Sequence, residues 1–195
     1  MTEIAVRRLG LGGSGAKGRV FEAVPIGGAR GMHAHAKLID AMVEYEKSCP
    51  RRVHHFLKVH GFAKTIAELE GIGERQRYIL EAAAIVHDIG IKPSLEKYGS
   101  SEGQLQEREG PPVARPMLQS LGYDEAAVER VCTLVSRHHT YTDIDGPDYQ
   151  ILVEADFLVN IYESDYPKEN VKKICEEIFR TEAGKRYCRL MYEPF

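Results

Sequence analysis

The sequence predicts an all-α fold, and two observations carry this prediction. From Ala34 onward, apolar residues recur almost without interruption at the three- and four-residue spacing of amphipathic helices. No segment after residue 31 alternates between apolar and polar residues well enough to indicate a strand. Glycines at positions 71, 73, 99, 122 and 146 mark several of the breaks between helices. About seven or eight helices are therefore expected, over residues 33–48, 51–70, 74–90, 103–121, 124–140, 148–165, 168–180 and 182–191.

The chain has 195 residues, which suits one compact domain with a tail. The first 31 residues differ from the rest, because a glycine-rich run such as residues 10–18 costs too much backbone entropy to order by itself. A flexible arm is favoured over a nucleotide-binding loop, since Lys17 stands one place late for a phosphate-loop motif and no hydroxyl residue follows it. We expect residues 1–31 to form this arm and residues 32–195 to form the helical domain.

Composition excludes several classes of protein. The chain has 26 Lys and Arg against 29 Asp and Glu, and the basic residues are scattered, which argues against a nucleic-acid partner. No apolar run approaches the roughly 20 residues that cross a bilayer, and residues 4–8 do not read as a signal peptide. We therefore expect a cytoplasmic protein without a membrane partner, in which all four cysteines are reduced thiols, namely Cys49, Cys132, Cys175 and Cys188.

Histidines and aspartates interrupt the apolar faces of several predicted helices. In the helix from residue 51, the apolar stripe through Val59 and Ile66 runs back to His55, whereas His54 falls on an exposed face. The next helix ends its apolar run with His87 and Asp88. Two further sites of the same kind lie at the adjacent residues His138 and His139 and at Asp156, within the most apolar stretch of the chain.

A single inward histidine is usually a hydrogen-bonded core residue, but the number of such residues here favours a metal site. Burying several histidines and aspartates without a cation would need several separate hydrogen-bonded networks, whereas one cation stabilises all of them. Nitrogen and oxygen ligands without cysteine favour a divalent ion, either one or two of Mn, Fe, Ni, Co, Zn or Mg.

These residues resemble the HD-domain superfamily of metal-dependent phosphohydrolases, whose pattern is His, then His-Asp, then Asp on an all-helical fold. The resemblance covers about residues 35–165 and implies that one metal is held by His55, His87, Asp88 and Asp156. Some members hold a second metal with further histidines. His139 matches one such position best, and His138 is the alternative.

The sequence departs from the family pattern at Glu109, which stands where a histidine is common. Three interpretations remain open: Glu109 is an oxygen ligand of a second metal, it binds through water, or the site holds one metal. The first is favoured, because a carboxylate is a good ligand for Mn or Fe. A second departure is that Ile91 separates the glycine after the His-Asp pair from Lys92.

The resemblance implies hydrolysis of a phosphate ester or anhydride in a small nucleotide-like substrate. Asp88 would bridge two metals or orient the attacking water, and Lys92 and Arg137 would stabilise the negative charge, with Lys58 a weaker candidate. Two alternatives remain, an HD-fold di-iron oxygenase and a metal-binding sensor without turnover. The helices after Asp156 are expected either to close the core or to form a homodimer contact.

Overall fold

The structure is a computed structural model that describes residues 30–193, with side chains from residue 34 onward. The predicted arm thus lies outside the described residues except for Arg30 and Gly31, which begin the first helix. The all-α prediction is confirmed, since residues 30–193 contain helices and no strand. The elements are α1 (Arg30–Tyr45), α2 (Pro50–Leu69), α3 (Glu74–Val86), η1 (His87–Gly90, a 3₁₀ helix), α4 (Ile91–Tyr98), α5 (Gly103–Ser120), α6 (Glu125–Val135), α7 (Pro147–Glu163), α8 (Lys168–Glu177) and α9 (Glu182–Tyr192).

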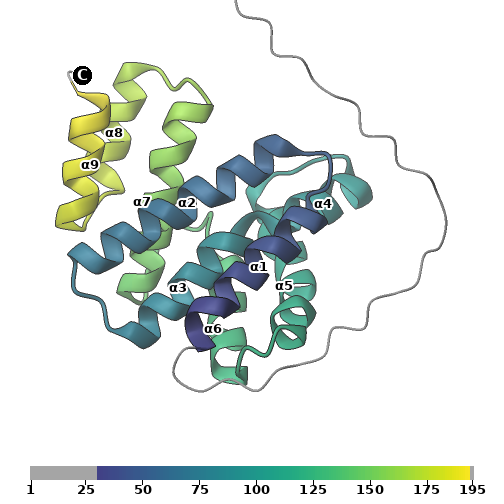
Figure 1. Ribbon diagram of the computed structural model, residues 1–195. Helices are drawn as coiled ribbons and strands as arrows, with labels where there is room; N and C mark the ends of the chain where they lie inside the picture. Colours follow the sequence, from purple (N-terminus) through teal and green to yellow (C-terminus); the bar gives the residue numbers. More distant parts are fainter. Residues whose placement is uncertain (1–29, 194–195) are drawn as a thin grey trace, which may run out of the picture.

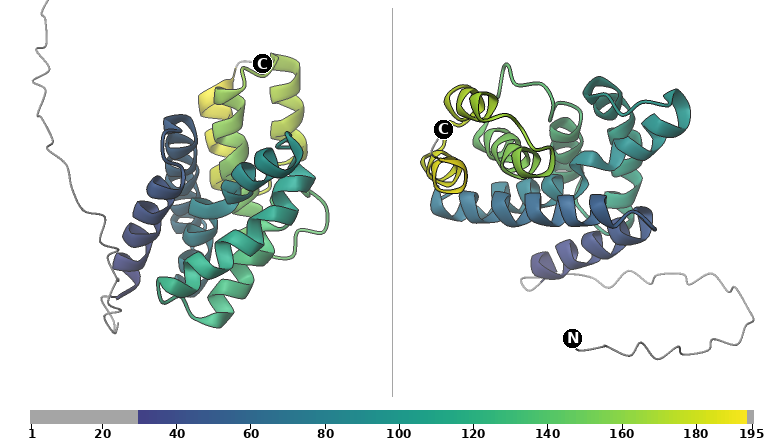
Figure 2. Two further views of the ribbon diagram at one scale, coloured as in Figure 1. Left: turned by 90° about the vertical axis from the view of Figure 1, so that its right-hand side faces the viewer. Right: turned by 90° about the horizontal axis from the view of Figure 1, so that it is seen from above.

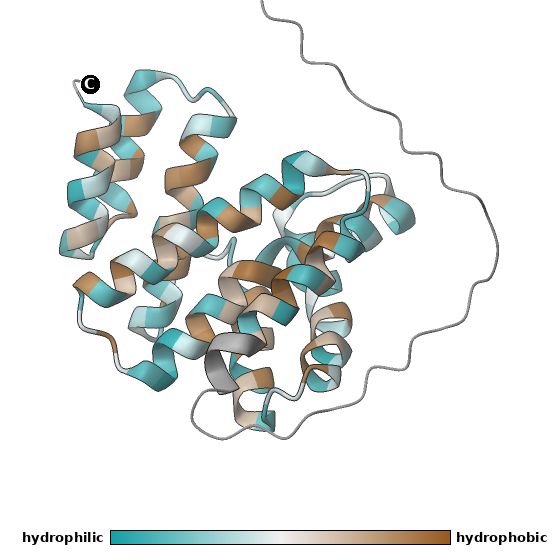
Figure 3. Ribbon diagram, viewed as in Figure 1, coloured by the Kyte–Doolittle hydropathy of each residue, from teal (hydrophilic) through white to brown (hydrophobic). Residues whose placement is uncertain are grey.

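Helices α2, α3 and α7 form the centre of the domain. Their facing sides are fully buried and largely aliphatic, as at Val59, Leu80 and Leu152. Figure 1 shows α8 and α9 beside α7 on one side of the domain and α4 and α5 on the other side, and Figure 2 shows α1 outside α2. The outer helices carry bands of polar and apolar residues, which are visible along α9 in Figure 3. Burial of the apolar faces accounts for the helical packing.

The predicted helix over residues 74–90 is shorter in the structure. Helix α3 ends at Val86, and the chain continues as η1 and then as α4, a helix that the sequence patterns did not predict. Gly90 and Pro93 indicate a break in the helical pattern. Proline is nevertheless tolerated in the first turn of a helix such as α4, because its missing N–H needs no partner there. Gly90 lies against the backbone of α5 without room for a side chain.

Helix α6 also ends earlier than predicted, at Val135 instead of residue 140. His138 and His139 therefore lie in the turn after the helix and not on it. The hydroxyl of Tyr149 on α7 lies within hydrogen-bonding distance of the carbonyl oxygens of Arg137 and Thr140, which share its single proton, and this contact fixes the turn against α7. Because these carbonyl oxygens bond a side chain of α7 and not a further turn of α6, the helix ends before the apolar periodicity of the sequence does.

The C-terminal helices close the core around α7, which is one of the two predicted roles for them. Cys188 on α9 is fully buried in the core, and the hydroxyl of Tyr192 donates to the carbonyl of Leu158. A homodimer contact stays a prediction. Cys175 and Cys188 form a disulfide between α8 and α9, so the prediction of four reduced cysteines is wrong for this pair. No helix in the described part of the chain is long and apolar enough to span a bilayer.

Candidate metal centre

Four side chains converge from three elements at the middle of the domain. His55 comes from α2, His87 and Asp88 from η1, and Asp156 from α7. His55 Nε2 lies 3.2 Å from His87 Nε2, 3.1 Å from Asp156 Oδ1 and 3.4 Å from Asp88 Oδ2. His87 Nε2 lies 3.5 Å from Asp156 Oδ1 and 3.6 Å from Asp88 Oδ2. The predicted registers of His55 and His54 are confirmed, because the first is buried and the second is exposed.

Hydrogen bonds to residues outside this group determine which ring nitrogen of each histidine carries the proton and which one faces the other ligands. His87 Nδ1 lies 2.9 Å from the carbonyl oxygen of Ala84, and His55 Nδ1 lies 3.0 Å from a carboxylate oxygen of Glu163. Because both partners only accept hydrogen bonds, both Nδ1 atoms carry the proton. The two Nε2 atoms therefore face each other and two carboxylates, and each can offer a lone pair to a cation once it carries no proton.

This donor set fits a divalent cation. Protons on both Nε2 atoms would place two imidazolium charges 3.2 Å apart, which is unfavourable in a buried site. A single metal ion bound to the imidazole nitrogens and carboxylate oxygens satisfies all four groups at once. His55, His87 and Asp88 are accordingly close enough together to hold a metal ion.

A second group shares Asp88 with the first. Asp88, His138 and His139 also lie close enough together to hold a metal ion. His138 Nε2 lies 3.5 Å from Asp88 Oδ1, while its Nδ1 donates to the carbonyl of Val135 at 2.8 Å. Within the described part of the chain, the Nε2 atoms of both histidines are buried without a hydrogen-bond partner. Unpaired buried nitrogens are costly, so their convergence on a shared carboxylate fits a second cation.

The electrostatics of the centre favour positive charge at the first group. Burial opposes protonation of His87, but Asp88 and then Asp156 outweigh burial and raise the pKa of His87 to about 9. Burial likewise opposes ionisation of Asp156, yet hydrogen bonds to His55 and His87 hold its pKa below the usual range. His139 differs, because burial and then the neighbouring His138 lower its pKa to about 4. At neutral pH the His139 ring is therefore uncharged and can act as a ligand.

Comparison with known proteins gives one match. The family model described as HD domain matches residues 52–181, which is about two thirds of the chain and contains all the residues of both groups. The chain belongs to the HD domain family. HD domains are all-helical and are in general metal-dependent phosphohydrolases, so the resemblance inferred from the sequence is confirmed. No curated protein and no solved structure matches the chain.

The structure does not bring Glu109 into either group of this HD domain. Its carboxylate is directed toward α4, where it accepts hydrogen bonds from Lys97 and from the hydroxyl of Tyr98, the latter at 2.8 Å. Arg108 also contacts it at 3.2 Å. Lys97 and then Tyr98 hold the pKa of Glu109 below its usual value. The interpretation of Glu109 as a direct ligand therefore has no support in this geometry.

The two predicted phosphate-binding cations have different surroundings. Among residues 30–193, Lys92 on α4 makes one long hydrogen bond of 3.4 Å to the carbonyl of Tyr45, with its ammonium 5.0 Å from the centre of the Tyr45 ring. Arg137 donates to the carbonyl of Asp143 at 3.0 Å and lies 5.3 Å from the centre of the Tyr149 ring. Arg137 is thus held by the loop after the paired histidines, whereas Lys92 has weaker attachments.

Two acidic residues near the centre were not selected from the sequence. Glu163 contacts His55, and Glu107 accepts hydrogen bonds at 3.0 Å from the amide of His139 and the hydroxyl of Thr140. The signal for Glu163 was present, since it follows Asp156 by seven residues and so lies on the same face of α7. Glu107 had no comparable signal, because its contact depends on the turn after α6.

Proposed function

We propose that this HD domain hydrolyses a phosphate ester or anhydride bond in a small nucleotide-like substrate. The observation that carries the proposal is the convergence of inward lone pairs and carboxylates on both sides of Asp88. Membership in the HD domain family supports metal-dependent hydrolysis as the reaction class. When bound by such ligands, a divalent metal acts as a Lewis acid and lowers the pKa of its water toward about 7.

In this proposal, different residues bind the cations and orient the attacking water. His55, His87 and Asp156 would hold the first cation, and His138 and His139 would hold the second. Among the ligands of the first cation, Asp88 is the most open to solvent, with a side chain 19% exposed against 8% for His55 and 0% for His87. Its carboxylate is therefore the group best placed to accept a hydrogen bond from the attacking water and to fix the direction of attack.

Lys92 is the cation we assign to the substrate phosphate. It follows Asp88 by four residues, and its long contact to the Tyr45 carbonyl costs little to exchange for a charged phosphate oxygen. Arg137 has hydrogen-bonding partners in its own loop, and we assign it to positioning that loop beside His138 and His139.

The experiment that tests the proposal is metal analysis of the purified protein, followed by a phosphate-release screen over nucleotides with Mn, Co, Ni and Mg. We expect phosphate release that depends on the metal. Asp88→Ala should abolish both metal retention and turnover, because it removes a ligand from both groups. His54→Ala is the matched control, since the exposed neighbour of His55 should leave both properties nearly intact.

The outcomes separate this proposal from its alternatives. Full metal occupancy without release of phosphate from any compound would overturn hydrolysis and favour a sensor. A product that forms only with dioxygen would instead favour the di-iron oxygenase.

A further inference from the structure

We propose that Glu163, held by Lys58, is a positioning residue that sets the tautomer and the ring orientation of the metal ligand His55. The inference rests on the proposed metal centre and adds to it a residue pair from outside the ligand set. Neither Glu163 nor Lys58 belongs to the groups that could hold a metal ion. Both nevertheless lie on the faces of α2 and α7 that carry ligands.

The carboxylate of Glu163 connects Lys58 to His55. One carboxylate oxygen of Glu163 lies 3.0 Å from His55 Nδ1, and the other accepts a hydrogen bond from the ammonium of Lys58. Lys58 follows His55 by three residues on α2, so the two side chains lie on the same side of that helix. The carboxylate thus joins α7 to α2, about two helical turns after the ligand Asp156 on α7.

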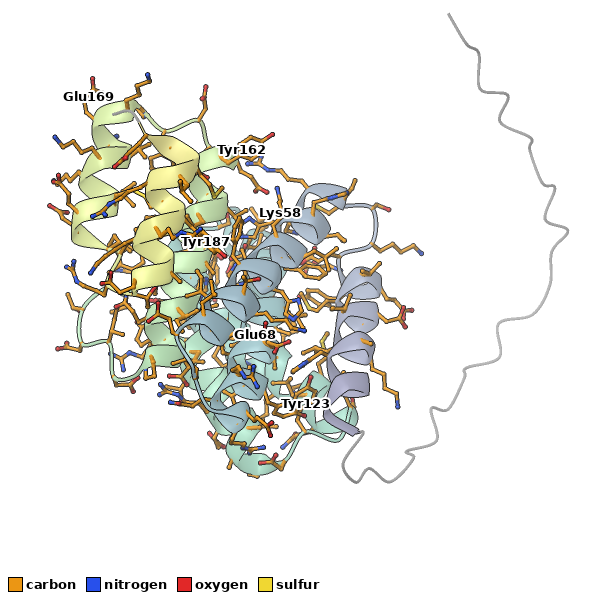
Figure 4. All side chains as sticks on the ribbon, turned by 60° about the vertical axis from the view of Figure 1, so that its left-hand side comes forward. Lys58, Glu68, Tyr123, Tyr162, Glu169 and Tyr187 are labelled. Atoms are coloured by element: carbon orange, nitrogen blue, oxygen red, sulfur yellow. A yellow bond between two sulfur atoms is a disulfide. The ribbon has the colours of Figure 1, made fainter. Side chains whose placement is uncertain are left out.

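The two ends of this ion pair differ in burial. The side chain of Glu163 is 13% exposed and that of Lys58 is 40% exposed. The Lys58 ammonium also lies 5.6 Å from the centre of the Tyr162 ring, and Figure 4 shows Lys58 and Tyr162 beside each other at this edge of the domain. Because Lys58 is engaged on both sides, we assign it to holding Glu163 and not to the substrate phosphate.

His55 differs from the other buried histidines of the centre in how its ring is fixed. His87 and His138 each use the backbone carbonyl three residues earlier, at Ala84 and Val135. The Nδ1 of His55 instead depends on a side chain from another helix. Removing Glu163 would free the ring to rotate or to place its proton on Nε2, where a proton blocks metal binding.

The test is metal affinity measured by competition with a chelator. Glu163→Ala should weaken binding of Zn or Mn by about 10- to 100-fold, the range seen when outer partners of metal ligands are removed. Glu163→Gln should recover part of the loss, because an amide oxygen still accepts from Nδ1. Lys58→Met should give a smaller loss, because it leaves the Glu163 contact with His55 in place.

A spectroscopic readout separates positioning from a loss of stability. In the zinc-loaded wild type with ¹⁵N-labelled histidine, the Nδ1–H of His55 should exchange slowly with solvent. That resonance should be lost in Glu163→Ala and retained in Glu163→Gln. The matched control is Glu81→Ala, since Glu81 is 14% exposed and lies 3.1 Å from His60 Nε2, outside both groups. It should leave metal affinity at the wild-type value.

The results distinguish failure of this inference from failure of the proposed function. Wild-type affinity in both Glu163 variants, with the His55 resonance unchanged, would overturn the positioning role while leaving the metal centre intact. A wild-type protein that binds no divalent metal would instead refute the centre itself. If Glu163→Ala does not fold, equal affinities of Glu163→Gln, Lys58→Met and wild type would still refute the inference.

Discussion

Replacing Gly90 by alanine tests how closely η1 must pack against α5. Gly90 follows Asp88 by two residues and is fully buried. A Cβ atom at this position would lie 2.9 Å from the amide nitrogen of Gly110 and closer still to the carbonyl oxygen of Gln106. Both neighbours are backbone atoms, which cannot rotate away as a side chain can.

The size of the effect follows from these contacts. Ordinary contacts of a Cβ begin at 3.4 Å, so η1 and α5 must separate by about 0.5 Å to relieve the contact with Gly110 and by more to relieve the contact with Gln106. Metal ligands and catalytic side chains must stay within about 0.5 Å of their productive positions. Gly90→Ala should therefore weaken metal binding, and the overpacking should destabilise the fold by about 1–3 kcal/mol. For a chain of this length that corresponds to a fall in Tm of about 2–12 °C.

The assay combines thermal unfolding with chelator competition for the metal. Gly61→Ala is the control, because Gly61 lies on the same helix as His55 and its Cβ would meet no atom of the described residues within 4 Å. That substitution should raise stability by about 0.5–1 kcal/mol, as alanine does in a helix interior, and leave metal affinity unchanged. Wild-type affinity and Tm in Gly90→Ala would refute the claim that close packing of η1 positions Asp88.

Two further predictions concern groups outside the centre. Glu154 is fully buried and accepts hydrogen bonds from Gln150 and from the amides of Arg180 and Thr181. Glu154→Ala should therefore lower the free energy of unfolding, measured with urea, by about 3 kcal/mol and leave metal binding unchanged. A loss below 1 kcal/mol would contradict that role. Burial lowers the pKa of His35 from 6.5, so the unfolded chain binds the proton more readily and stability should fall as the pH drops below 6.5. His35→Gln should show a smaller decline between pH 7 and pH 5, and an equal decline would exclude His35 as its source.

The helical class and the inward position of His55 could be predicted because both follow from apolar periodicity along single helices. His55 is 6% exposed, and its neighbour His54 is exposed, as the register required. The four residues of the first group could also be found from their order in the sequence. The structure brings these four together, which a helical pattern alone does not establish.

The break at η1 and the helix α4 could not be predicted, because they depend on contacts between distant segments. Gly90 packs on the α5 backbone, and that contact is invisible in a local window. The misplaced expectation for Glu109 has the same origin. Its carboxylate is bound by Lys97 and Tyr98, which both belong to the unpredicted helix. Sequence spacing placed Glu109 near the motif but could not give the direction of its side chain.

The sharing of Asp88 between two groups has a thermodynamic consequence. Its Oδ2 faces His55 and His87, while its Oδ1 faces His138. A cation on one side withdraws charge from the carboxylate that the other side needs, and it also fixes the orientation of that carboxylate. For the two cations proposed above, the two affinities would thus be linked, and the coupling free energy would be the same whichever ion binds first. Metal titrations of this protein should therefore deviate from two independent, identical sites, with the sign of the deviation showing whether charge withdrawal or orientation dominates.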